Sequence, residues 1–78
     1  MINQKKVQNA PRIQSLGRAN SILDVIAGAD ETGASLSSIS KETGLNKTTA
    51  FNLLASLVTL RFVDQDRLSR KYRLGFRF

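Results

Sequence analysis

The sequence contains neither cysteine nor histidine. No disulfide can form, so the fold has to be stabilised by packing alone. Zinc sites built from cysteine and histidine ligands are excluded, and the zinc-finger class with them. Acid–base and triad chemistry that depends on histidine is excluded as well. Because the chain also lacks a glycine-rich phosphate loop and paired acids in a pocket-forming context, we expect no enzyme, no metal and no other cofactor.

Long apolar segments are missing too. No run approaches the roughly 18 apolar residues that a membrane-spanning helix needs. Near the amino terminus, Lys5 and Lys6 are not followed by the apolar core of a signal peptide. The sequence therefore predicts no membrane partner and favours a cytoplasmic location.

Positive charge, in contrast, is in excess. Lys and Arg total 12 against 6 Asp and Glu, which gives a net charge of +6 on 78 residues. This length allows one small domain, and 41% hydrophobic residues are enough for its core. A strongly basic domain attracts polyanions such as DNA, RNA or an acidic membrane surface. The alternative is a basic surface that serves only solubility.

The first segment, residues 1–12, is polar and basic and contains the only proline, Pro11. We predict a flexible arm there, which either has no role or reaches along DNA as some basic arms do. Residues 13–78 are predicted to form the domain itself.

A first helix is predicted from Ser15, whose hydroxyl can cap a free amide of the first turn. Gly28 ends this helix, and residues 29–34 form a loop. The apolar residues of the helix recur at helical spacing and predict one buried stripe. They are Leu16, Ala19, Ile22, Leu23 and Ile26.

A second, short helix is predicted to begin after the N-cap Ser35 and to end at Thr43, where Gly44 can take the left-handed conformation. Leu36 and Ile39 face inward from this helix. Leu45 then follows as an apolar anchor in the turn.

A third helix, from about Lys47 to Leu60, is capped by Asn46. Its apolar face follows the i, i+3, i+4, i+7 pattern and consists of Ala50, Leu53, Leu54 and Leu57. Its opposite face is small and neutral, with no acid anywhere between residues 47 and 60, and carries Thr48, Asn52, Ala55, Ser56 and Thr59.

The last segment changes to a period of two. Residues 62–65 predict one strand, and from Tyr72 onward Tyr72, Leu74 and Phe76 alternate with basic residues in a second. A basic hairpin tip, residues 66–70, joins them. The predicted fold class is therefore mainly α (α+β): a winged helix-turn-helix of three helices and a small C-terminal β-hairpin wing, with the helix-turn-helix at about 35–60 and the wing at about 62–76.

This order of elements predicts DNA binding, because the second helix of a helix-turn-helix lies in the major groove. A lysine at the start of a helix opposes the helix dipole, so Lys47 is better explained by a nearby phosphate or guanine edge. Thr48 and Thr49 can reach a phosphate or a thymine methyl, and Asn52 can make two bonds to adenine. Phe51 lies on the flank and can either pack on the core or touch a thymine methyl.

Basic residues outside this helix are candidates for backbone contacts. Arg67, Arg70 and Lys71 suit a wing that lies on the phosphates or in the minor groove, although a solvated hairpin tip has the same composition. Arg18, on the polar side of the first helix, is a candidate phosphate clamp.

With these residues in place, the chain resembles the amino-terminal winged helix-turn-helix of the IclR family of bacterial transcriptional regulators. The resemblance spans about residues 13–78 and rests on IQSLGRANSILDVI, LSSISKETGLNKTTAFNLLASLV, RFVDQD and KYRLG. It implies a repressor or activator that binds double-stranded palindromic operator DNA as a homodimer. It also implies a larger effector-binding carboxy-terminal domain that is missing here, which suggests a truncated chain or a separated domain.

The chain departs from the family pattern in two places. Family members often carry a basic or ring-nitrogen residue where Phe51 and Asn52 stand, and a proline or glycine at the wing tip. Two other functions stay open: a winged helix used for protein assembly or RNA binding, and a dimerisation module in which Val25 joins a partner helix. An acidic or apolar recognition face would favour the assembly or RNA function, and this face is neither.

Overall fold

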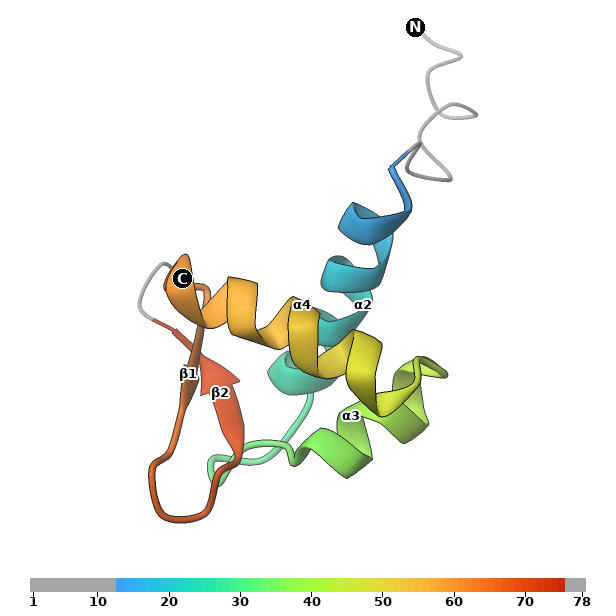
Figure 1. Ribbon diagram of the computed structural model, residues 1–78. Helices are drawn as coiled ribbons and strands as arrows, with labels where there is room; N and C mark the ends of the chain where they lie inside the picture. The colour runs from blue at the N-terminus through green and yellow to red at the C-terminus, as the bar shows by residue number, and fades with distance from the viewer. Residues whose placement is uncertain (1–12, 76–78) are drawn as a thin grey trace, which may run out of the picture.

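The computed structural model describes residues 13–75 (Figure 1). Three helices come first: α2 (Gln14–Ala27), α3 (Leu36–Thr43) and α4 (Lys47–Thr59). A two-stranded antiparallel hairpin follows, with β1 (Val63–Gln65) and β2 (Tyr72–Leu74). The predicted winged helix-turn-helix is confirmed by this arrangement. The predicted arm, residues 1–12, and the predicted strand position Phe76 lie outside the described residues.

Helix α2 begins two residues earlier than expected, at Gln14, where the predicted cap at Ser15 would start it at Leu16. Ile13 is the N-cap, in an extended conformation and without a side-chain cap, and its carbonyl oxygen accepts hydrogen bonds from the amides of Leu16 and Gly17. The prediction that Ser15 caps this helix is therefore wrong, because the chain is already helical at Ser15. Gly28 does end the helix, as predicted, with ordinary right-handed dihedral angles.

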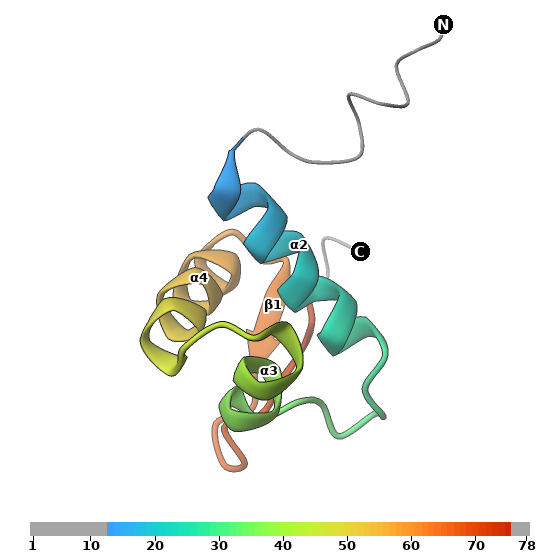
Figure 2. The same cartoon turned by 90° about the vertical axis from the view of Figure 1, so that its right-hand side faces the viewer.

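The apolar stripe of α2 is buried only along part of its length. Ile22 and Ile26 lie in the core, and Ala19 and Leu23 pack against it. Leu16, however, is 63% exposed, so its expected place in the buried stripe is wrong. The first turn of α2 extends beyond the packed part of the other two helices (Figure 2), and Leu16 there lines an open depression with Leu60.

The helix-turn-helix follows the predicted caps. The Ser35 hydroxyl accepts a hydrogen bond from the Ser38 amide, and Gly44 ends α3 in the left-handed conformation with φ of 79°. The side chain of Asn46 accepts a hydrogen bond from the Thr49 amide at 2.8 Å and starts α4. Helix α4 ends at Thr59, one residue short of the prediction, with Leu60 as its C-cap.

Side-chain hydrogen bonds hold the turn between α3 and α4. The Ser40 hydroxyl donates to the Leu45 carbonyl oxygen at 2.5 Å, and the Thr43 hydroxyl accepts from the Leu45 amide at 3.2 Å. Leu45 itself packs against the core as a partly buried residue, as expected of the anchor. These contacts set the angle at which α4 leaves α3.

The core lies where the three helices and the hairpin meet. Its fully buried large side chains are Ile22, Ile39, Leu54 and Val63, one from each helix and one from β1. Helix α4 buries Ala50, Leu54 and Leu57, with Leu53 partly buried beside them. Because this face of α4 is committed to the core, its opposite face is held toward solvent.

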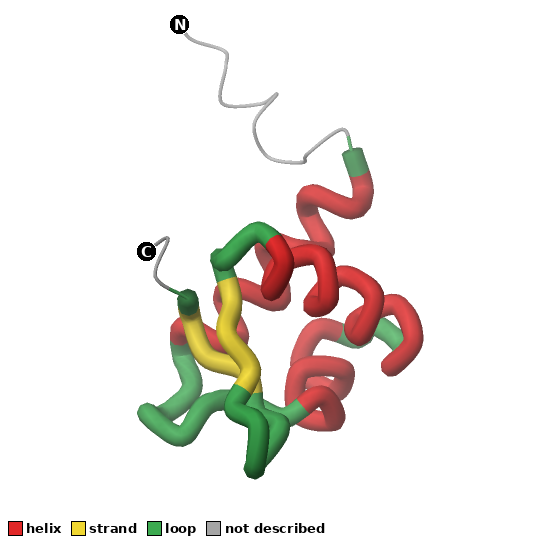
Figure 3. The backbone as a smooth tube through the Cα atoms, turned by 60° about the vertical axis from the view of Figure 1, so that its left-hand side comes forward, coloured by secondary structure: helices red, strands yellow, loops and turns green. Residues whose placement is uncertain are grey.

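The wing is tied to the loop before α3, which the sequence did not predict. Besides the pairing of the two strands β1 and β2 (Figure 3), Ala34 forms an isolated antiparallel bridge with Tyr72. The Ala34 amide donates to the Tyr72 carbonyl oxygen at 2.9 Å, and the Tyr72 amide donates to the Ala34 carbonyl oxygen at 2.8 Å. A single paired residue has no period of two, so residues 29–34 looked like an unpaired loop.

Candidate nucleic-acid interface

The first turn of α4 presents its predicted contact residues unequally. Lys47 and Thr48 are exposed, whereas Thr49 is partly buried and gives its amide to the Asn46 cap. The first turn contains no acidic residue. Its positive end is therefore open to an anion, with one amide already taken by the cap.

An exposed stripe runs along α4 opposite the core. It consists of Thr48, Phe51, Asn52, Ala55, Ser56 and Thr59. Phe51 is 49% exposed and belongs neither to the core nor to the partly buried side chains that pack on it. Of the two positions that the sequence allowed for Phe51, the structure shows the surface one.

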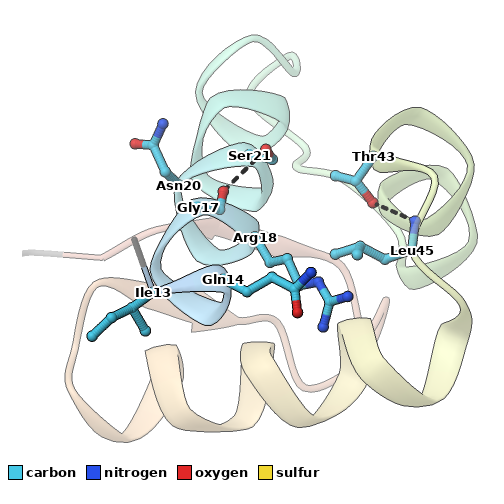
Figure 4. A pocket seen from close by; sticks show the side chains of 8 residues that line it. All are labelled: Ile13, Gln14, Gly17, Arg18, Asn20, Ser21, Thr43 and Leu45. Carbon is cyan, nitrogen blue, oxygen red and sulfur yellow. Dashed lines mark hydrogen bonds between the residues drawn. The ribbon is translucent and has the colours of Figure 1, made fainter. Parts of the chain in front are cut away.

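Arg18 lies on the side of α2 that faces the turn of the helix-turn-helix. It is partly buried and lines a depression of about 480 Å³ with Gln14, Thr43 and Leu45. The Gln14 and Arg18 side chains lie beside each other there, with Thr43 and Leu45 across the depression (Figure 4). Arg18 thus lies beside the turn between α3 and α4.

The wing tip is held by Asp66. The Asp66 carboxylate accepts hydrogen bonds from the amides of Ser69 at 2.8 Å and Leu68 at 3.1 Å. These bonds, with Ser69 contributing most, lower the pKa of Asp66 below its ordinary value. Arg70 takes the left-handed conformation with φ of 67° and closes the turn by donating its amide to the Asp66 carbonyl oxygen.

The predicted wing cations fall into two groups. Arg67 and Arg70 are exposed at the tip. Lys71 is partly buried and lines a depression of about 340 Å³ together with Asp30 and Glu42. The pKa of Asp30 is lowered chiefly by hydrogen bonds from Thr32, and the positive charge of Lys71 adds to this shift. Lys71 therefore lies against the loop between α2 and α3, unlike the two arginines.

One further cation of the wing escaped the sequence interpretation. The Arg73 guanidinium lies 3.7 Å from a carboxylate oxygen of Asp66, with its side chain half exposed. Its alternation with Tyr72 and Leu74 indicated a solvent-facing strand residue, but not a partner at the tip. An exposed pair of this kind contributes little to stability, and the Asp66 carboxylate offsets part of the positive charge that Arg73 brings to the wing.

Within residues 13–75, the structure holds neither a membrane-spanning helix nor a cluster of metal ligands. None of the helices within residues 13–75 is long and apolar enough to cross a bilayer. In the same part of the chain, no group of three or more acidic, cysteine or histidine residues is placed to hold a metal ion.

Comparison with known proteins places this geometry among regulators. Residues 15–67 match the model of the IclR helix-turn-helix domain. The glycerol operon regulatory protein of Streptomyces coelicolor is 44% identical over 66 residues, which cover 85% of this chain and 26% of that protein. The HTH-type transcriptional regulator XynR of Escherichia coli K12 is 40% identical over 67 residues, covering 86% of this chain and 26% of XynR. The chain thus spans about a quarter of the length of these curated relatives.

Solved structures show the same fold. An IclR transcriptional regulator from Alicyclobacillus acidocaldarius superposes with a TM-score of 0.77 at 31% identity, covering 83% of this chain and 26% of that one. An IclR family transcriptional regulator from Brucella abortus gives a TM-score of 0.71 at 26% identity, covering 96% of this chain and 27% of the other.

Proposed function

Because the chain belongs to the IclR helix-turn-helix family, we propose that it binds operator DNA sequence-specifically with α4 in the major groove. It is an IclR-type helix-turn-helix DNA-binding domain of transcriptional regulators, and such a domain is not an enzyme. The observation that carries the proposal is the exposed, acid-free face of α4, held outward by the core residues behind it. The same molecule adds two exposed arginines at the wing tip.

The contact residues divide into base-reading and backbone-binding groups. On α4, Asn52 is suited to two hydrogen bonds with adenine, while Lys47 and Thr48 can reach a phosphate or a base edge from the first turn. Thr49 is less exposed and is suited to a phosphate at the flank. The proposed backbone contacts come from outside α4 and are made by Arg18, Arg67, Arg70 and Lys71. Lys71 lies near Asp30 and is partly buried, so it is less accessible than the two arginines.

We also propose that the domain binds palindromic DNA as a homodimer. An apolar depression of about 570 Å³ lies between α2 and the end of α4, and Leu16 and Leu60 line it. These two side chains are 63% and 51% exposed. We propose that a second copy covers them, because two copies related by a two-fold axis would read two inverted half-sites. Val25, the earlier candidate for this contact, packs against the core of its own chain.

Steric block of polymerase and recruitment of polymerase are both compatible with operator occupancy. The effector-binding carboxy-terminal domain that the resemblance implies stays a prediction.

Selection of bound duplexes from a random DNA pool tests the proposal. The wild-type domain should enrich an inverted repeat. Asn52→Ala should lose preference at one position of each half-site, an effect of about 1–3 kcal/mol for a two-bond base contact. Arg70→Ala, at the wing tip, should weaken all sequences alike. Enrichment of no sequence, or unchanged preference in Asn52→Ala, would contradict the proposal or the role of Asn52 respectively.

The alternative functions, protein assembly and RNA binding, make a different prediction in the same assay. A domain of that kind would bind duplex DNA without sequence preference or not at all, and RNA of matched sequence would compete efficiently. The exposed face of α4 carries neither the acidic nor the extended apolar surface that would favour protein assembly.

A further inference from the structure

The exposed stripe of α4 is unusual in what it offers to a base edge. In the described part of the chain, the residues of this stripe include no arginine, glutamine or acid, and Asn52 is its one amide. Lys47 stands at the start of the helix. Bidentate guanine recognition most often uses arginine or lysine, and cytosine is read by acids. The stripe is therefore poor in the groups that recognise G·C pairs.

The same stripe presents several apolar groups to solvent. Thr48, Phe51 and Ala55 are spaced by three and four residues, so they lie on one face of α4, and all are exposed. The Phe51 ring is the largest of these groups, and it is 49% exposed without a place in the core. A phenyl ring has neither donor nor acceptor for a base edge. In the major groove, the apolar group that distinguishes one base from another is the C5 methyl of thymine.

Resting on the DNA-binding function proposed above, we propose that Phe51 reads thymine methyl groups and that each half-site is rich in T·A pairs. Phe51 contacts a thymine methyl with its ring, the methyl groups of Thr48 and Ala55 line the same groove, and Asn52 reads a neighbouring adenine. From residue 48 to residue 55 the helix rises about 10 Å, the length of roughly three base-pair steps. The stripe therefore matches a half-site core of about that size.

Deoxyuridine gives a direct test, because it pairs with adenine as thymidine does and lacks only the methyl group. The duplex enriched in the selection would be prepared with uracil in place of thymine at one half-site position at a time. The wild-type domain should bind about fourfold more weakly when the contacted methyl is removed, as expected for one buried carbon group. At DNA positions outside this half-site core, replacing thymine by uracil should not change the affinity.

A double-mutant cycle separates the methyl contact from any change in DNA stiffness. Phe51→Ala should weaken binding to the thymine duplex and bind thymine and uracil duplexes equally at that position. Leu68→Ala is the matched control, since Leu68 is a 94% exposed apolar residue at the wing tip, and it should keep the fourfold ratio. Thermal unfolding of each variant verifies that Phe51→Ala remains folded.

The outcomes distinguish this inference from the function on which it rests. If no duplex is enriched, DNA binding itself fails. If a sequence is enriched and Asn52→Ala changes its specificity, but uracil substitution leaves the affinity unchanged, the domain binds DNA and the methyl-reading role is wrong. A half-site core of G·C pairs would overturn it equally.

Discussion

At Gly33, the loop before α3 passes directly against the wing. This residue has φ of 95°, and a Cβ added there would lie 2.5 Å from the Tyr72 carbonyl oxygen. Gly33→Ala should therefore strain the backbone and push Ala34 away from Tyr72. We expect a loss of about 1–3 kcal/mol in the free energy of unfolding, measured by urea denaturation.

Gly28→Ala is the matched control for that substitution. Gly28 has φ of −86°, and an added Cβ there would make only an ordinary contact, 3.5 Å from the Asp24 carbonyl oxygen. Its stability should stay within about 1 kcal/mol of the wild type. If both variants lost the same free energy of unfolding, the close approach of Gly33 to Tyr72 would not matter for stability.

Residue by residue, the candidate interface was only partly predictable. The pattern of α4 identified which face is exposed, because burial on a regular helix follows its period. The position of Phe51 at the edge of that face was ambiguous in the sequence and depended on how α2 and α3 pack beside it. Arg70 and Lys71 are adjacent in the sequence and carry the same charge, but Arg70 is exposed and Lys71 is partly buried. The sequence does not show this difference, because it arises from the path of the hairpin.

At the scale of the element, α4 depends on its cap. The Asn46 side chain satisfies the Thr49 amide, which otherwise has no partner within the helix. Asn46→Ala should lower the free energy of unfolding by about 1 kcal/mol. For a domain of this size, the midpoint of thermal unfolding should fall by about 4–8 °C.

Asn20→Ala serves as the comparison for the cap. Asn20 is exposed within α2 and holds no helix end, so alanine there should leave the melting temperature unchanged or raise it slightly. If both variants melted at the wild-type temperature, the Asn46 hydrogen bond would contribute nothing measurable to α4.

The elements themselves were predictable where a local signal decides them. Ser35, Gly44 and Asn46 act through bonds within a few residues, and all were identified from the sequence. Ser15 was misplaced because the N-cap is Ile13, which makes no side-chain hydrogen bond and so leaves no capping signal in the sequence. The burial of Leu16 and the pairing of Ala34 depend on distant parts of the chain, which no local pattern reveals.

For the whole molecule, the number of phosphate contacts sets how binding responds to salt, and the excess of positive charge, +6, supplies the cations for them. Each phosphate contact should contribute about −0.9 to the slope of log affinity against log salt concentration. Arg70→Ala should therefore make the slope shallower by about 0.9 for each bound protomer. Fluorescence anisotropy with the selected duplex at several salt concentrations measures this slope.

Leu68→Ala removes no charge from the same wing tip and should leave the slope as it is. An affinity independent of salt would be incompatible with an interface built on phosphate contacts. A slope that Arg70→Ala leaves unchanged would place Arg70 away from the DNA backbone.

The bridge between Ala34 and Tyr72 has a consequence for the entropy of binding. Both residues are buried, and Tyr72 and the nearby Val63 share one core with Ile39 of α3. The wing therefore cannot swing away from the helices without exposing that core. A DNA-binding domain whose wing is already ordered loses little conformational entropy when it binds the duplex. More of the free energy of its contacts therefore remains as affinity.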